Sequence, residues 1–140
     1  MSKVAVVYWS GTGNTEAMAL AVANGIKNKG AEAVVLTSAE FDASQMDNYD
    51  AIAFGCPSMG AEELENSEFA PMFESCETNL EGKKIALFGS YGWGDGEWMR
   101  NWEKTCIDAG AVMACDYVIC NELPDEDSIS ACESLGGALV

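Results

Sequence analysis

The sequence predicts a single α/β domain over residues 1–140, with a parallel β-sheet sandwiched between helices on both faces. The chain has 140 residues and is 49% hydrophobic, which is enough for one domain with a substantial core. Apolar runs of strand length alternate strictly with segments of helical periodicity, a pattern typical of right-handed crossovers between parallel strands. The first run is apolar throughout, as expected for a strand that is covered on both faces.

The first half of the chain contains three predicted strands and one helix. Val4–Trp9 is a β-branched and aromatic run that ends in a Ser-Gly-Thr-Gly loop. Helical spacing of apolar residues follows over 14–29, and a glycine stands directly after it, as at many helix ends. Further strands are predicted at 33–36 and 51–56, and Pro57 stops the second of them.

The second half alternates in the same way. Residues 61–81 predict a loop that leads into an amphipathic helix. A buried strand follows at 84–89, then a helix over 98–109, in which two tryptophans one turn apart indicate core positions. A fifth strand is predicted at 111–120 and a fourth helix from 125 to the C-terminus. Periodicity gives five strands and four helices, but it does not give their order in the sheet.

Charge and composition exclude several classes of function. The chain has 23 acidic and 7 basic residues, for a formal charge of −16. A nucleic-acid-binding protein needs a basic surface, and an anionic membrane would repel this chain, so we expect neither partner. The sequence has no histidine, which removes Ser-His and Cys-His catalysis and histidine-ligated metals.

The cysteines predict core thiols rather than a metal site. None of the six belongs to a Cys-x-x-Cys pair or to a zinc or iron–sulfur spacing, so we expect no bound metal and mainly buried, reduced thiols. The N-terminal segment has too short an apolar run for a signal peptide or a spanning helix, and we expect a cytoplasmic protein. The cysteines are Cys56, Cys76, Cys106, Cys115, Cys120 and Cys132.

The loop Ser10–Thr15 predicts an anion-binding site. It places hydroxyl, amide and glycine residues directly before a helix, whose first N–H groups have no partner within the helix. No Lys or Arg stands in the loop, so neutral donors would hold a phosphate. Glu16 replaces the third glycine of a dinucleotide-binding fingerprint, and the Gly-Lys pair of a P-loop is absent. Taken alone, the loop is equally consistent with a simple helix-capping turn.

Two further loops follow predicted strands and carry ring-binding side chains. In parallel sheets, ligands lie beyond the carboxyl ends of the strands. Met59 stands beside a glycine after the third strand, and Trp93 stands between two glycines after the fourth. Each could merely pack against neighbours, but together they could enclose a flat aromatic ligand.

These three loops together resemble the short-chain, clostridial type of flavodoxin. The segments are SGTGNT at 10–15, CPSMGAE at 56–62 and GSYGWGD at 89–95, and the match covers the whole chain in length and order. The resemblance implies a flavodoxin-like three-layer sandwich with strand order 2-1-3-4-5, which is the order known for that family. It implies a monomeric, low-potential one-electron carrier with non-covalently bound FMN, rather than an enzyme. Such a carrier would work in place of ferredoxin and meet redox enzymes with basic docking surfaces.

The resemblance also implies roles for individual residues. The first loop would hold the FMN phosphate, Met59 and Trp93 would cover the two flavin faces, and Glu62 would accept from flavin N3–H. The Gly60 carbonyl would accept a hydrogen bond from N5–H of the reduced flavin. Ala61 departs from the Asp of some relatives, a difference that bears on the flexibility of the loop and not on the function. Amides near Gly92 would meet the flavin carbonyls, and Asn121 would lie near the ribityl chain. The complete implied set is Ser10, Gly11, Thr12, Gly13, Asn14, Thr15, Pro57, Ser58, Met59, Gly60, Ala61, Glu62, Ser90, Tyr91, Gly92, Trp93, Gly94, Asp95 and Asn121.

Other classes of protein could share features of this sequence. A phosphorylation receiver domain needs acids after strand one, an Asp ending strand three and a Lys ending strand five, and this sequence has none of them there. An FMN-dependent quinone or NAD(P)H reductase stays open, although Trp93 on the exposed flavin face would block a second substrate. A flavodoxin-like partner for metal-cofactor maturation also stays open.

The acidic segment Glu62–Glu81 has two interpretations. It carries seven acids and no base. It could simply be the solvated face of a helix, or it could steer basic redox partners toward the protein.

Overall fold

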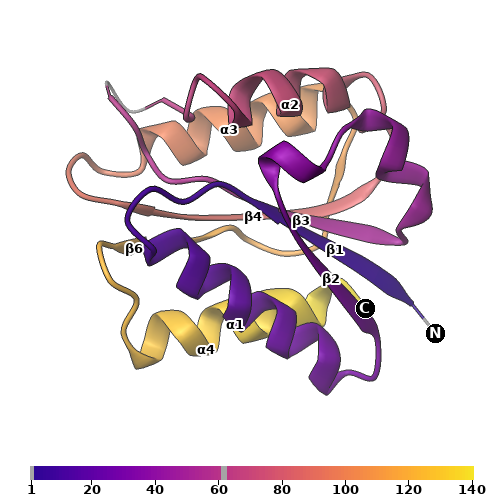
Figure 1. Cartoon of the computed structure of the whole chain (residues 1–140), viewed down its shortest axis with the longest axis horizontal. Coiled ribbons are helices and arrows are strands. Elements are labelled where there is room, and N and C mark those ends of the chain that lie inside the picture. Colours follow the sequence, from indigo (N-terminus) through magenta and orange to yellow (C-terminus); the bar gives the residue numbers. More distant parts are fainter. Residues whose placement is uncertain (1, 61–62) are drawn as a thin grey trace.

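The predicted parallel sheet between helical layers is present (Figure 1). The structure is a computed structural model that describes residues 2–60 and 63–140. Neighbouring strands follow the order β2-β1-β3-β4-β5, and β6 also pairs with β4. This confirms the order 2-1-3-4-5 that the resemblance implied. The strands are β1 (Lys3–Tyr8), β2 (Glu32–Thr37), β3 (Ala51–Gly55), β4 (Lys84–Tyr91), β5 (Val112–Met113) and β6 (Val118–Asn121).

Helices cover the two faces of the sheet in pairs (Figure 1). One face carries α1 (Asn14–Asn28) and α4 (Glu126–Ala138), and the other carries α2 (Phe69–Glu77) and α3 (Glu97–Asp108). The polar segment between β2 and β3 forms two 3₁₀ helices, η1 (Ser38–Glu40) and η2 (Ala43–Asn48). Among the described residues, no helix combines the length and the apolar character needed to cross a bilayer.

The central strands are buried on both faces, which explains their continuous apolar runs. Along β1, Val7 packs into the core under α2 and α3, while Val6 packs into the core under α1 and α4. Trp98 and Trp102 are 2% and 3% exposed and belong to the first of these cores, as the sequence predicts. Five of the six cysteines are buried and all six are free thiols, so the predicted core thiols are confirmed for all but Cys115, which is partly exposed.

The fifth predicted strand is interrupted, which periodicity did not predict. Lys84 pairs with Val112, but Phe88 pairs with Val118, so the outer strand uses more residues than β4 over the same length. The extra residues lie between β5 and β6 and include the exposed Asp116. An edge strand tolerates such an insertion because only one side of it needs a partner. After the interruption, β6 ends beside the carboxyl end of β4.

Helices α1 and α4 touch through their backbones at two glycines. A Cβ built on Gly25 would lie 1.9 Å from the Glu133 carbonyl oxygen, and one on Gly136 would lie 2.1 Å from the Val22 carbonyl oxygen. Both contacts are with backbone, which cannot move aside as a side chain can. The close helix pair fixes α1, and α1 begins at the predicted anion-binding loop.

We expect Gly136→Ala to lower the free energy of unfolding by about 1–3 kcal/mol or more, because the added methyl overpacks the α1–α4 contact. Gly137→Ala is the matched control on the same helix. Its Cβ would lie 3.2 Å from the flexible Lys29 side chain and 4.0 Å from the Gly25 carbonyl oxygen, which is an ordinary contact distance. We therefore expect the free energy of unfolding to stay the same or to rise by up to about 1 kcal/mol. Denaturant titration of both variants measures the difference. Equal stability of the two variants would contradict the close contact.

Candidate functional site

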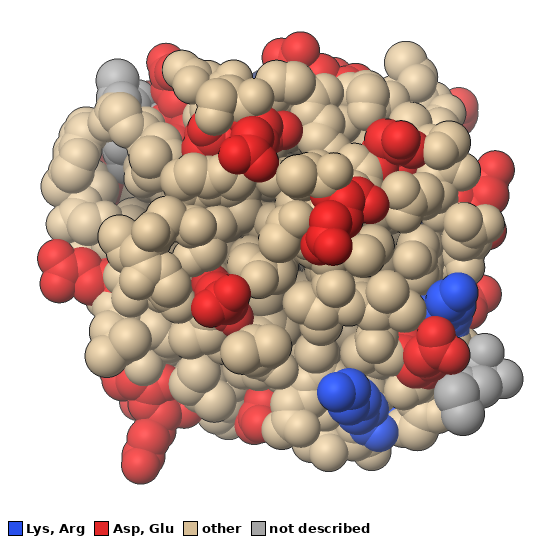
Figure 2. Space-filling model, in the orientation of Figure 1, with Lys and Arg blue, Asp and Glu red and all other residues tan. Residues whose placement is uncertain are grey.

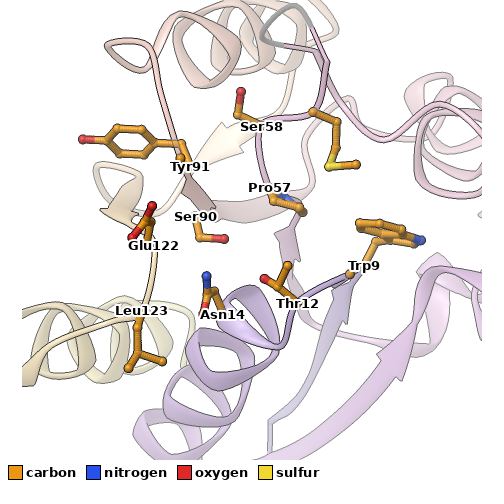
Figure 3. A pocket seen from close by; sticks show the side chains of 12 residues that line it. Trp9, Thr12, Asn14, Pro57, Ser58, Ser90, Tyr91, Glu122 and Leu123 are labelled. Carbon is orange, nitrogen blue, oxygen red and sulfur yellow. The ribbon is translucent and has the colours of Figure 1, made fainter.

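A cavity of about 490 Å³ opens at the carboxyl ends of the strands (Figure 3). It lies beside β1 and β3, where the chain switches from one side of β1 to the other, and this is the expected ligand position in such sheets. The end of β4 and segments after β1, β3, β4 and β6 line it. The lining residues are Trp9, Gly11, Thr12, Asn14, Pro57, Ser58, Met59, Ser90, Tyr91, Gly92, Glu122 and Leu123.

The first loop presents free backbone donors next to the helix α1. Ser10 Oγ accepts from the Gly13 N–H at 3.0 Å, and Gly13 precedes α1 with a left-handed φ of 95°. Within the described part of the chain, the N–H groups of Gly11 and Thr12 have no hydrogen-bond partner. Both residues are exposed and line the cavity. Unpartnered amides at a helix N-terminus are suited to an anion.

Thr15 does not line the cavity, although the resemblance implied a phosphate ligand there. Its side chain is buried, and its hydroxyl shares a 2.8 Å hydrogen bond with the hydroxyl of Ser90, which does line the cavity. The Ser90 N–H also points to the Thr15 hydroxyl, at 3.4 Å. The pair therefore ties the start of α1 to the end of β4.

The second loop forms one wall of the cavity. Pro57, Ser58 and Met59 line it, and the Ser58 N–H donates to the Ser90 carbonyl at 2.9 Å. Met59 and Glu63 exchange two backbone hydrogen bonds of 2.8 and 2.9 Å, which close the turn around Gly60. Gly60 has a left-handed φ of 55° and is exposed. Two implied residues of this loop, Ala61 and Glu62, lie outside the described residues.

Glu65 anchors the second loop to α2. It is only 6% exposed, and its carboxylate accepts from the N–H groups of Ser67, Glu68 and Phe69 at 2.8–2.9 Å and from the Ser67 hydroxyl. Burial raises the pKa of Glu65, but these hydrogen bonds outweigh it and lower the pKa to about 2. The Glu65 N–H donates to Cys56 Sγ, and burial raises the pKa of that thiol to about 12, so it stays neutral.

Ser90 and Tyr91, which the sequence placed in the third loop, are the last residues of β4, and they line the cavity together with Gly92. Trp93 is 62% exposed and does not line it, so the implied stacking of this ring on a ligand stays a prediction. Gly94 follows with a left-handed φ of 88°, and the Asp95 carboxylate pairs with Arg100 at 3.0 Å on the surface.

The sequence did not predict three of the residues that line the cavity: Trp9, Glu122 and Leu123. Trp9 ends the first apolar run, where a side chain could equally face the core. Asn121, which the resemblance implied, donates from its amide to the Tyr91 carbonyl at 3.4 Å and does not itself line the cavity. The next residues do, because they extend past the carboxyl end of β6. That strand-end position is the signal that could have identified them.

The match to known proteins decides the family. The family model described as flavodoxin matches residues 6–136. The chain belongs to the flavodoxin family. It is 44% identical to a flavodoxin of Megasphaera elsdenii over 96% of each chain, and 46% identical to one of Clostridium beijerinckii over 86% of this chain and 88% of that one. The solution structure of two-electron reduced Megasphaera elsdenii flavodoxin superposes with a TM-score of 0.90, covering 97% of each chain.

Flavodoxins bind FMN and transfer electrons, so this flavodoxin-family chain is an FMN-binding electron carrier and not an enzyme. The cavity fits that cofactor. Its volume of about 490 Å³ is in the usual range for a small-molecule site. One end offers uncharged N–H donors for a phosphate, and the other is walled by Met59, Tyr91 and backbone.

We expect Glu65→Gln to destabilise the protein in a pH-dependent way. The folded pKa of Glu65 is depressed below its unfolded value of 4.5, so its contribution to stability is present above about pH 5 and is lost as the pH falls toward 2. The free energy of unfolding of the wild type should exceed that of the variant by roughly 2–3 kcal/mol at pH 7. The gap should shrink at pH 3, as measured by urea unfolding at several pH values. A gap that is constant from pH 7 to pH 3 would contradict the charged cap.

Proposed function

We propose that this protein is a low-potential one-electron carrier that passes electrons between redox enzymes in place of ferredoxin. The observation that supports this proposal is the cavity at the switch point between β1 and β3, which has free amide donors at one end and a wall of thioether and aromatic side chains at the other. FMN, when bound, supplies the capacity to take and release electrons one at a time. The chain supplies the binding, the wall groups and the charge around it.

The loop after β1 is assigned to the phosphate. The N–H groups of Gly11 and Thr12, with the side chains of Ser10, Thr12 and Asn14, would hold it without any cation. Hydrogen bonds to a charged group contribute roughly 1.5–3 kcal/mol each, and the start of α1 adds about half a positive charge. Thr15 would support the loop indirectly, because its hydrogen bond to Ser90 fixes the start of α1.

The loops after β3 and β4 are assigned to the flavin ring. Met59 lies at the cavity and would cover one face, while the exposed Trp93 would have to turn toward the cavity to cover the other. Backbone N–H groups near Gly92 would meet the ring carbonyls. Gly60 would present its carbonyl toward the ring edge, because its left-handed backbone lets the turn after Met59 adopt that direction.

The acidic surroundings would lower the potential. Glu122 lines the cavity, and the whole chain carries a formal charge of −16. At an effective dielectric constant of about 20, one carboxylate about 10 Å from an added negative charge opposes it by roughly 1.7 kcal/mol before screening by salt. Several carboxylates together would make the fully reduced protein a strong electron donor.

Exposed acids in α2 and in the segment before it support docking to basic redox partners. Glu63, Glu68 and Glu74 are exposed, and residues 63–81 contain no basic residue. Figure 2 shows carboxylates spread over the whole viewed face, whereas the few basic side chains lie at its lower right. A negative surface attracts a basic partner over a distance and raises the association rate.

We also propose that the protein is a cytoplasmic monomer. A net charge of −16 makes copies of the chain repel one another. All six cysteines are free thiols, which suits a reducing compartment.

The test of this function is a stepwise reduction of the purified holoprotein, followed by its visible spectrum. We expect a yellow protein that takes up two electrons at two separate midpoint potentials. Gly60→Ala should bring the two potentials closer together, because a left-handed backbone costs an L-residue about 1–2 kcal/mol. Gly82→Ala is the matched control, since Gly82 also has a positive φ and open space around it, but neither of its chain neighbours lines the cavity, whereas Gly60 directly follows the lining residue Met59.

A colourless protein that does not bind FMN would refute the proposed carrier. If Gly60→Ala has the same two midpoint potentials as the wild type, only the role of the Gly60 turn is refuted.

Steering predicts a salt-dependent association rate with a basic haem protein of the cytochrome c type. The rate, from stopped-flow mixing, should fall about tenfold between about 0.01 M and about 0.5 M ionic strength. Glu68→Gln/Glu74→Gln should slow it at low salt more than Glu32→Gln/Asp47→Asn, which removes the same charge near the opposite ends of the strands. A rate that salt does not change would remove the steering role.

A further inference from the structure

Trp9 lines two cavities. It lines the 490 Å³ cavity together with Thr12 and Asn14 (Figure 3). It also lines a second cavity of about 270 Å³, whose other walls include Tyr8, Ser10 and Glu16. The Trp9 N–H donates to the Gly55 carbonyl at 3.0 Å, which fixes its backbone to β3. The ring is therefore mounted on the sheet and stands beside the first loop.

The ring edge is in close contact with Gly11. A Cβ built on Gly11 would lie 3.0 Å from Cη2 and 3.2 Å from Cζ3 of Trp9. Gly11 is not one of the glycines with positive φ, so its backbone conformation is open to any residue. The indole, and not the backbone, is thus the reason that this position suits glycine. A contact this close fixes the distance between the ring and the loop.

The loop has little else to define its shape. Residues 11–13 are exposed, two of the three are glycines, and Ser10 Oγ with Gly13 N–H is the one hydrogen bond that crosses the loop among the described residues. Glycine-rich loops lose much conformational entropy when they are ordered. A rigid surface behind Gly11 reduces that cost, because it excludes part of the space into which the loop could move.

We propose that Trp9 is a positioning residue that holds the N–H groups of Gly11 and Thr12 in place for the phosphate, and so sets the preference for FMN over its phosphate-free counterpart, riboflavin. This inference rests on the proposed placement of the FMN phosphate in the first loop. Riboflavin carries the same ring and ribityl chain, so a residue that acts on the phosphate loop should affect only FMN. A residue that walls the ring should affect both ligands alike.

The test compares FMN and riboflavin affinities of the apoprotein by titration calorimetry. We expect Trp9→Ala to weaken FMN binding about tenfold or more and riboflavin binding less than about twofold, with Trp9→Phe in between. Trp93→Ala is the matched control, because it removes an indole assigned to the ring and should weaken both ligands by similar factors. Inorganic phosphate is a second probe, and it should compete with FMN less well in Trp9→Ala than in wild type.

Gly11→Ala tests the contact itself and does not require removal of the indole. The added methyl should weaken FMN binding about tenfold in the wild-type background, since overpacking displaces either the ring or the loop. In a Trp9→Ala background the same change should have less than about a twofold effect, because the obstacle is gone. Such non-additivity identifies a direct coupling between the two residues.

The outcomes separate this inference from the proposed function. Wild type that binds FMN, with Trp9→Ala losing FMN and riboflavin by equal factors, would overturn the positioning role and leave the carrier intact. Equal effects of Gly11→Ala in both backgrounds would overturn the contact. Wild type that binds neither flavin would refute the carrier itself.

Discussion

The central constraint on this molecule is that a strongly acidic chain has to hold an anionic cofactor. The formal charge is −16, and no basic side chain is among the described residues that line the cavity, so attraction by a lining lysine or arginine is not available. The remaining source of positive potential is the backbone, through the amides of Gly11 and Thr12 and the start of α1. Backbone donors act only when their direction is fixed. The loop therefore depends on its supports, and these extend through the whole sheet edge.

Those supports tie the cavity loops to one another. Ser90 is the common point, since its hydroxyl bonds to Thr15, at the start of α1, and its carbonyl accepts from Ser58 in the loop after β3. On the far side of that loop, Glu65 satisfies the first N–H groups of α2. Helix α1 is in turn held against α4 by backbone contact at Gly136. The two ends of the cavity, which we assign to the phosphate and to the ring, thus share one framework. Where these contacts support the cavity, cofactor binding meets preformed walls.

Much of this framework could be predicted from the sequence. Strands buried on both faces leave continuous apolar runs, such as Val4–Trp9, and helices leave a different period, so the layers and the carboxyl-end loops follow. The interruption between β5 and β6 did not follow, because periodicity reports burial and not register. Glu65 was one of seven acids in an exposed-looking segment, and only the fold shows that its carboxylate turns inward to cap α2. The strand order itself came from resemblance, since crossover handedness leaves several orders open.

Trp9 shows why side-chain direction is the hardest part to predict. An aromatic residue at the end of a buried strand fits the apolar pattern whether its side chain packs into the core or points away from the sheet. A shift of the strand end by one residue is enough to change one direction into the other. In the fold, Trp9 lies past the last residue of β1 and its ring meets Gly11, two residues further on. The apparent last residue of a strand is thus the first wall of the site. Trp9 packs against the core under α2 and α3 and also lines the cavity, so an apolar residue that adjoins a glycine-rich loop after a parallel strand is a candidate site residue even where it contacts the core.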